Sequence, residues 1–249
     1  MKYIKNNYLQ KITLAGIACS LLLLTGLSGC SSSDSTPAAT TVTISGKVSD
    51  TADVAEPGVA VEVVYTTPGA AGNVSTTTNA SGDFSLTVNK NTTFYVRISK
   101  TDFATLNSEK GSTDVDEAVG TLNIPTSDEA QGLINQAFGL GAPLLANHAW
   151  LVVGVEDASG DELNGVTIAS VPAETDEVYA NCDGTDSNGG ATTGAICPLP
   201  DEREGVQYIA YFDATADVTV TATSTVPPAA DNATAPVRMG EIAFIDFEL

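Results

Sequence analysis

Short stretches in which apolar and polar residues alternate run through most of the chain. Residues 42–50, VTISGKVSD, place Val42, Ile44 and Val48 on one face, and residues 58–65, GVAVEVVY, continue the pattern. A period of two is typical of a β-strand that buries one face. Similar stretches lie at 84–88, 93–99, 118–124, 206–213, 217–224 and 240–249. Many short alternating strands separated by turn signals predict an all-β chain of sandwich type.

The alternating pattern occurs twice, at one constant offset. A shift of 107 positions aligns Val48 with Val155, and the same shift aligns TNASG at 78–82 with TDSNG at 185–189. Both five-residue sequences are typical of a hairpin tip, with an Asn or Asp that bonds its own backbone and a Gly that supplies positive φ. Agreement at two distant places indicates a duplicated module.

We therefore expect two antiparallel Greek-key-type β-sandwich domains joined by a short helix-containing linker. The first domain is predicted at 42–124, the linker at 125–148 and the second domain at 149–249. Residues 30–41, rich in Ser, Thr and Ala, predict a flexible tether in front of the first domain. Residues 1–29 are a targeting segment that is excluded from the fold.

The linker carries the one helix signal of the chain. In PTSDEAQGLINQAFGLG, Thr126 and Glu129 predict a capping box, and Gly139 or Gly141 can end the helix. Three turns of helix are not stable alone in water, so the helix must pack on something. Its apolar stripe packs on one or both sandwiches, or it covers the open edge of the first; both alternatives stay open. The stripe consists of Ala130, Leu133, Ile134, Ala137 and Phe138.

Acidic residues dominate the charge of the chain. The sequence has 10 Lys and Arg against 31 Asp and Glu, a net charge of −21. Lys2, Lys5 and Lys11 lie in the first 29 residues, so without that segment 7 bases face 31 acids, a net charge of −24. Such a surface repels nucleic acid and anionic lipid headgroups, and neither is expected as a partner of the folded part.

The N-terminal segment ends in a lipidation signal. A basic start, MKYIKNNYLQK, precedes an apolar run too short for a confident membrane span, and LSGC follows at 27–30. This arrangement resembles the bacterial lipoprotein signal. The resemblance implies cleavage before Cys30, a diacylglycerol on its thiol and an acylated amino group. Ser31 after that cysteine implies outer-membrane sorting, on either the periplasmic face or the cell surface. The alternative is an ordinary secretory signal with an incidental Cys.

The first module resembles a known domain family. SGKVSD, EPGVAVEV, TTTNASGDFSLTV and FYVRISK follow the pattern of the carboxypeptidase regulatory-like domain, a transthyretin-like seven-stranded sandwich. The second module matches less well, because Ala191 stands where the family has an aromatic residue. Such domains occur as non-catalytic appendages and surface modules, so the resemblance implies no catalytic residue and no cofactor.

Two cysteines remain after Cys19 and Cys30 are assigned to the N-terminal segment. Cys182 and Cys197 flank the predicted second hairpin tip. In an exported chain a remaining pair forms a disulfide more often than a redox or metal site. Closing this loop would contribute about 3 kcal/mol in the loop-entropy account. A disulfide between these residues is therefore expected.

Residue types that carry catalysis are sparse. His148 is the single histidine, with no second His for a usual zinc site and no sequence partner for a triad, so a packed or surface role is expected. Carboxylate pairs of glycosidase type occur everywhere in so acidic a chain and point to no particular residues. Lys47 resembles the isopeptide-forming lysine of Gram-positive pilus modules, but the strand alternation turns it to solvent. No catalytic site and no isopeptide are predicted.

Calcium is the one metal considered. The loops with Asp183, Asp186 and Asn188 and with Asp114, Asp116 and Glu117 offer hard oxygen ligands, but their spacing differs from that of an EF-hand. Asp and Asn also fill turns for backbone reasons. No metal site is therefore predicted, and a calcium role stays open.

These features favour a non-enzymatic, membrane-anchored envelope lipoprotein that acts as a structural spacer or protein-interaction module. Its expected partners are the membrane, through Cys30, and another envelope or extracellular protein. The alternative is a carbohydrate-binding or adhesive surface module, since sandwich loops often present aromatic residues to sugars. Its candidate residues are Trp150, Tyr179, Tyr208 and Tyr211.

Overall fold

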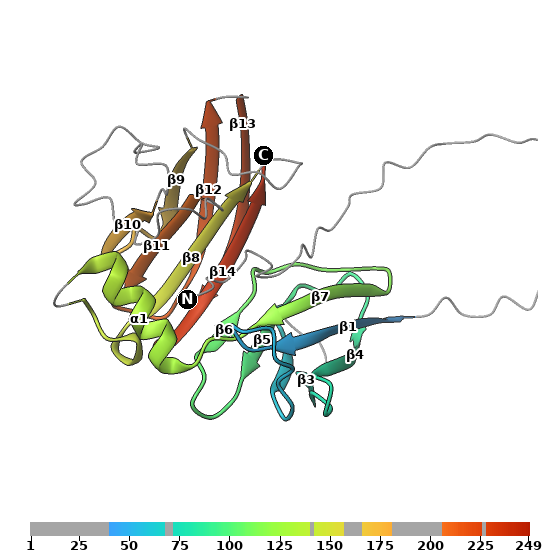
Figure 1. Ribbon diagram of the computed structural model, residues 1–249. Coiled ribbons are helices and arrows are strands. Elements are labelled where there is room, and N and C mark those ends of the chain that lie inside the picture. Colours follow the sequence, from blue (N-terminus) through green and yellow to red (C-terminus); the bar gives the residue numbers. More distant parts are fainter. Residues whose placement is uncertain (1–39, 68–71, 140–141, 157–165, 181–205, 226–227) are drawn as a thin grey trace, which may run out of the picture.

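Three β-sheets and one α-helix make up the described part of the protein (Figure 1). The structure is a computed structural model that describes residues 40–67, 72–139, 142–156, 166–180, 206–225 and 228–249. We refer to β1–β7 as the first strand set and to β8–β14 as the second strand set. The predicted strands are confirmed as strands, and the chain is mostly β as expected.

The first strand set comprises β1 (Thr41–Ser49), β2 (Ala60–Tyr65), β3 (Val74–Thr77), β4 (Asp83–Asn89), β5 (Phe94–Ser99), β6 (Thr105–Asn107) and β7 (Glu117–Asn123). Helix α1 (Ser127–Phe138) and the 3₁₀ turn η1 (Leu145–Asn147) follow. The second strand set comprises β8 (Ala149–Glu156), β9 (Val166–Val171), β10 (Asp176–Ala180), β11 (Val206–Phe212), β12 (Ala216–Thr225), β13 (Pro228–Val237) and β14 (Glu241–Glu248).

One sheet contains strands of both sets. Its order is β10-β11-β8-β14-β6-β5-β2-β3, and two three-stranded sheets, β4-β1-β7 and β13-β12-β9, complete the fold. The two sets meet where β6 pairs with β14 in parallel, with Leu106 opposite Ile242 and Asn107 opposite Ala243. We call this place the joint.

The expectation of purely antiparallel sheets was wrong. β1 pairs in parallel with β7, and β14 pairs in parallel with both β8 and β6. Parallel pairs need a long connection, and the first and last strands of each set are separated by most of that set. The eight-stranded sheet also replaces the predicted picture of two separate Greek-key sandwiches, because the sets share a sheet.

The duplication is visible in the strand pairing. β1 lies between antiparallel β4 and parallel β7, and β8 lies between antiparallel β11 and parallel β14. Val48 pairs with Leu122, and Val155, which is 107 positions after Val48, pairs with Phe247 in the same way. The sequence offset therefore relates strands with the same neighbours in the same directions.

The predicted first hairpin tip is confirmed. Asn79 Oδ1 accepts the backbone N–H groups of Ser81 at 2.8 Å and Asp83 at 3.0 Å. Gly82 has φ of 81°, and a Cβ there would lie 2.4 Å from the Val48 carbonyl oxygen. The second tip, residues 185–189, lies outside the described residues.

Apolar residues form one continuous row on one face of the large sheet. Directly paired residues on six neighbouring strands belong to this row, and all of them contribute to a single hydrophobic cluster. The sheet β4-β1-β7 supplies the opposite side of the cluster in the first set, and α1 supplies it in the second. The row consists of Val61, Ile98, Leu106, Ile242, Trp150 and Tyr211.

Helix α1 has the predicted cap and most of the predicted stripe. Thr126 Oγ1 accepts the N–H of Glu129, whose carboxylate accepts the Thr126 N–H, and Gly139 is the C-cap residue with φ of 78°. Ala130, Ile134 and Ala137 are buried in the cluster that includes both strand sets, whereas Leu133 is 36 % exposed, contrary to the prediction. The helix therefore packs on the shared sheet rather than capping one edge (Figure 1).

Candidate interaction site at the joint

The second face of the large sheet changes character at the joint. The row that runs Glu62, Arg97, Asn107 in the first set continues as Ala243, Leu151, Ala210 in the second. The three apolar residues are buried under the sheet β13-β12-β9. Glu62 and Arg97 are partly exposed, whereas Asn107 is buried beside the edge of that sheet, so the joint forms a corner between a partly open polar face and the sheet β13-β12-β9.

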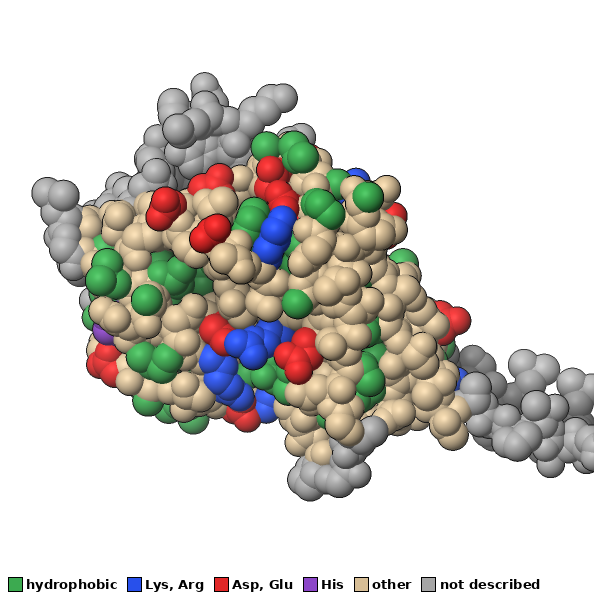
Figure 2. Space-filling model, turned by 90° about the horizontal axis from the view of Figure 1, so that it is seen from below, with side chains coloured by type: hydrophobic (Ala, Val, Ile, Leu, Met, Phe, Trp, Pro, Cys, Tyr) green, Lys and Arg blue, Asp and Glu red, His purple; other side chains and the backbone are tan. Residues whose placement is uncertain are grey.

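Charged side chains of both signs gather at this corner. We call Arg97, Asn107, Lys110, Asp217, Arg238 and Glu241 the joint cluster. Three of the six basic residues in the described part of the chain belong to it. Figure 2, which views the molecule from below, shows Lys and Arg side chains grouped beside Asp and Glu side chains near the centre of this face, with further Asp and Glu side chains around them.

Glu241 connects β14 with two strands of the first set. Its carboxylate forms an ion pair with Arg97 of β5 and accepts a hydrogen bond from Asn107 Nδ2 of β6 at 2.8 Å. The Glu241 side chain is 14 % exposed and that of Arg97 is 39 % exposed. A mostly buried carboxylate with two donors is satisfied, so this contact ties the sets together beside their backbone pairing.

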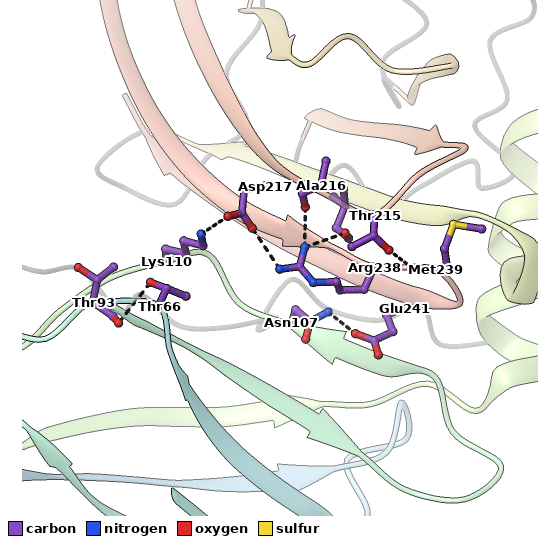
Figure 3. Close-up of polar contacts among 11 residues, drawn as sticks. Thr66, Thr93, Asn107, Lys110, Thr215, Ala216, Asp217, Arg238, Met239 and Glu241 are labelled. Carbon is purple, nitrogen blue, oxygen red and sulfur yellow. Dashed lines mark hydrogen bonds and ion pairs between the residues drawn. The ribbon is translucent and has the colours of Figure 1, made fainter. Parts of the chain in front are cut away.

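Asp217 forms the second connection. Its carboxylate accepts from Lys110 Nζ at 2.5 Å and from Arg238 at 3.2 Å (Figure 3). Lys110 also donates its backbone N–H to the Thr234 carbonyl of β13 at 2.7 Å. Arg238 is held by the Ala216 carbonyl at 2.6 Å. Burial alone would raise the pKa of Asp217, but hydrogen bonds from Lys110 and Arg238 outweigh it and lower the pKa.

Glu109 introduces an opposing interaction at the same place. Burial raises its pKa to about 7, and the Asp231 carboxylate of β13 adds to the increase. The segment that places Lys110 against β13 therefore also places the Glu109 carboxyl group near the Asp231 carboxylate. Burial and the nearby Asp231 both disfavour the charged form of Glu109.

A small cavity lies under the joint. It has a volume of about 20 Å³, enough for a single water molecule. Asn107 is 1 % exposed, and its Oδ1 has no hydrogen-bond partner among the described residues. The cavity lies where β14 extends beyond the end of the three-residue strand β6. Its lining consists of Val96, Ile98, Leu106, Asn107, Ser108, Leu122, Asn123 and Phe244.

His148 lies at the edge of an aromatic cluster. Its Nδ1 is 3.0 Å from Asp213 Oδ1, and its ring lies 4.8 Å from that of Tyr211, which packs on Trp150 and Phe138. This is the packed position expected from the sequence. The ring helps close the end of the core under α1.

The aromatic residues considered for sugar stacking are largely inside the protein. Trp150 is 1 % exposed and Tyr208 is fully buried, while Tyr211 is half-buried in the aromatic cluster. Tyr179 is in β10, and its side chain lies outside the described residues. The described aromatic candidates therefore pack in the core.

In the predicted acidic loop at 114–117, a carboxylate accepts a hydrogen bond from a backbone N–H group. Asp116 Oδ1 accepts the Thr43 N–H at 2.7 Å, which holds the loop against the start of β1. Burial raises the pKa of Glu117 despite a hydrogen bond with Thr113. Among the described residues, no group of three or more His, Cys, Asp or Glu is placed to hold a metal ion. The other loop, with Asp183, Asp186 and Asn188, lies outside them.

The covalent sites predicted from the sequence lie outside the described residues. These are the lipidation site at Cys30 and the disulfide between Cys182 and Cys197. Lys47 is described: it is half-buried in β1, opposite Asp83 of β4 and Thr121 of β7. Among the described residues, no helix has the length and apolar character needed to cross a membrane.

The joint cluster could not be identified from the sequence. Arg97 interrupts the outward face of an otherwise apolar strand, and Glu241 opens another, but these positions are separated by 144 residues. Only the pairing of β6 with β14 brings them together. A charged residue at one outward position of each strand was the available signal, and it could not show which strands were neighbours.

Comparison with known proteins shows distant structural similarity only. The chain matches no protein-family model and no curated protein. Among solved structures it is similar to a type II cohesin–X-dockerin complex of Acetivibrio cellulolyticus, with 24 % identity and a TM-score of 0.28 over 34 % of this chain and 58 % of the other. The match therefore spans less than two thirds of that protein.

Two further similarities cover more of the chain. The minor pilin of Streptococcus agalactiae shares 10 % identity over 83 % of this chain and 94 % of the other, with a TM-score of 0.22. A candidate adhesin of Bacteroides ovatus shares 11 % identity over 90 % of this chain and all of the other, with a TM-score of 0.25. The protein is thus distantly similar to bacterial β-sandwich domains, which assigns it no family and no activity.

Proposed function

We propose that the protein is a membrane-anchored envelope lipoprotein that acts as a spacer and protein-interaction module without catalysing a reaction. Cys30 would carry the lipid, as the resemblance of LSGC to the lipoprotein signal implies. Two or more acyl chains would anchor it stably, since each buried CH₂ contributes about 0.8 kcal/mol. Residues 30–41 would separate the folded part from the membrane.

One observation carries the spacer role. The strand sets share one eight-stranded sheet, and the joint adds ion pairs through Glu241 and Asp217 to the backbone pairing. Two modules joined by a flexible linker would move independently, whereas modules that share a sheet and a hydrophobic cluster keep one orientation. A fixed orientation is what a spacer requires when it presents a distant surface to a partner.

The corner at the joint supports the interaction role. It combines an open polar sheet face with both signs of charge, in a chain whose overall charge is strongly negative. Mixed charge of this kind contributes specificity and orientation to a protein contact more than affinity. The buried positions of Trp150 and Tyr208 do not favour the carbohydrate-binding alternative.

The proposal is tested on the natural chain in its own cells. Mass spectrometry of the membrane-extracted protein should show a chain that begins at Cys30 and carries acyl groups, and Cys30→Ala should move it to the soluble fraction. Cross-linking in intact cells, followed by purification, should recover a distinct partner protein. The test variant for the surface is Arg97→Glu, which should reduce the recovery of the partner if the joint corner is the contact surface. An unacylated mature protein, or no partner in any condition, would contradict the proposal.

A further inference from the structure

Among the described residues no strand pairs with the outer edge of β4 in the first set, although the counterpart edge in the second set is paired. β4 ends the sheet β4-β1-β7, with Leu86 opposite Ile44 of β1. The counterpart β11 places Ala210 opposite Leu151, which is 107 positions after Ile44, and β11 also pairs with β10 on its other side. The molecule itself thus shows that a five-residue antiparallel strand fits at this position.

The backbone of β4 directs hydrogen-bonding groups outwards at alternate residues. The Gly82 carbonyl accepts from Val48 of β1, whereas the carbonyl of Asp83 and the N–H of Asn89 bond to groups outside the β1–β4 pair. Because the direction alternates along an antiparallel strand, Ser85 and Thr87 direct their N–H and C=O groups away from β1.

The second strand set supports this outward direction of the backbone N–H and C=O groups. By the pairing register, Tyr211 of β11 corresponds to Thr87 of β4. The Tyr211 carbonyl accepts a hydrogen bond from the backbone N–H of Thr175, just before β10, at 2.8 Å. The group that is satisfied by β10 in the second set therefore has its equivalent on the open edge of β4. Within the part of the chain that the structure describes, no strand pairs with that edge.

We propose that the outer edge of β4 binds β4 of a second copy of this chain, antiparallel and centred on Leu86. This register places Ser85 of each copy opposite Thr87 of the other copy, so that four backbone hydrogen bonds form. It covers residues 84–88, the same length as β10 on β11. The contact is closed by a two-fold axis and yields a dimer rather than a fibre.

The charges along β4 favour this occupant. Asp83 lies at one end of the strand and Lys90 just beyond the other, so an antiparallel copy brings each Asp83 close to the other chain's Lys90. The strand between them contains no charge, no Pro and no bulge, the features that usually protect an edge. A self-complementary edge of this kind fits a second copy better than an unrelated strand.

The distribution of charge over the chain also favours contact through the first set. Residues 41–124 contain 5 basic and 10 acidic residues, whereas residues 125–249 contain 2 basic and 20 acidic residues. Two chains that approach through β4 bring together their less acidic parts. Repulsion between the two copies is therefore smaller here than at an edge of the second set.

The test measures the mass of the full chain in detergent solution, and of the chain from Ser31 to Leu249, by sedimentation velocity. A dimer that dissociates on dilution is expected. Thr87→Pro removes two of the four donors and should weaken association on the order of tenfold, while circular dichroism confirms an intact fold. A natural chain that stays monomeric at about 100 µM, where even a weak dimer would be populated, overturns the proposal.

Charge reversal and cross-linking test the register independently of the Pro variant. Asp83→Lys and Lys90→Glu should each weaken the dimer, and the double variant should restore it. A mixture of Ser85→Cys and Thr87→Cys chains should give cross-linked dimers that neither variant gives alone. Equal cross-linking in all samples, or a double variant weaker than both single variants, contradicts the register. These measurements use purified protein, so they are independent of the anchor and of any other partner.

Discussion

The two strand sets have the same pairing order but different surroundings. In the first set the sheet β4-β1-β7 ends at the uncovered edge of β4, and in the second set β10 covers the corresponding edge of β11. Position 43 in β1 holds a half-buried Thr, and the corresponding position 150 in β8 holds a buried Trp. The outward face of β1 meets solvent, whereas that of β8 packs under α1.

The difference relates the outward residues of each strand set to what lies next to them. The pairing depends on alternation and turns, which both sets retain, while the outward residues follow what lies next to them. Where α1 covers the sheet, the outward positions of β8 and β11 are aromatic or aliphatic. On β1 and β4, which no described element covers on that side, they are polar. Variants at matched positions of the two sets can test this account.

The largest effect is expected for Trp150→Ala. Removing a large, fully buried aromatic side chain should lower the free energy of unfolding by about 3–5 kcal/mol. The matched variant Thr43→Ala should cost less than about 0.5 kcal/mol, because its side chain is not part of the core. Urea unfolding followed by circular dichroism measures both. Equal losses would show that the two outward faces do not differ as described.

A smaller effect is expected for Glu109→Gln, and it depends on pH. The folded-state pKa of about 7 lies above the ordinary value of 4.5, so the native state holds a proton that the unfolded state releases. This group therefore reduces the free energy of unfolding as pH rises from about 4.5 to about 7, by up to about 3 kcal/mol. Glu109→Gln should remove that decrease.

The control for Glu109 is Glu62→Gln, which removes a carboxylate from the same open face but away from β13. This variant keeps Glu109, so its free energy of unfolding should still fall as pH rises from about 4.5 to about 7. Thermal unfolding at several pH values gives both slopes. A Glu109→Gln chain with an unchanged slope would show that Glu109 is not buried against Asp231.

The smallest effect is expected for Glu241→Gln. The loss of charge opposite Arg97 should lower stability by about 1–2 kcal/mol at low salt, and by less at high salt, because the pair is partly screened. Glu56→Gln is the matched control, since Glu56 pairs with Lys100 within the first set. Only the joint variant should separate unfolding into two transitions, as detected by calorimetry.

The sequence predicted the local features of this fold well. Alternation located the strands, and the capping box located α1, because each depends on residues close in the chain. The hairpin tip at Asn79 and Gly82 was predictable for the same reason. Leu133 was placed in the buried stripe because helical periodicity alone does not say where the stripe ends.

The joint could not be predicted from the sequence. It depends on a three-residue strand, β6, and on parallel pairing with β14 more than 130 positions away. The residues of neither strand indicate which strand it pairs with, because Leu106 and Ile242 are ordinary apolar residues. The ion pairs of Glu241 and Asp217 depend on that pairing, so they could not be predicted from the sequence either. The sequence could therefore indicate two modules but not their fusion.

The pairing of the first strand with the last in each set affects how the protein is made. Ile44 meets Glu117, 73 positions later, and Leu151 meets Ala243, 92 positions later. During synthesis β1 and β8 must each wait for nearly a whole set to emerge before this neighbour exists. Folding dominated by such distant contacts is slow. Slow folding in turn lengthens the time for which β1 and β8 lack their parallel neighbours β7 and β14.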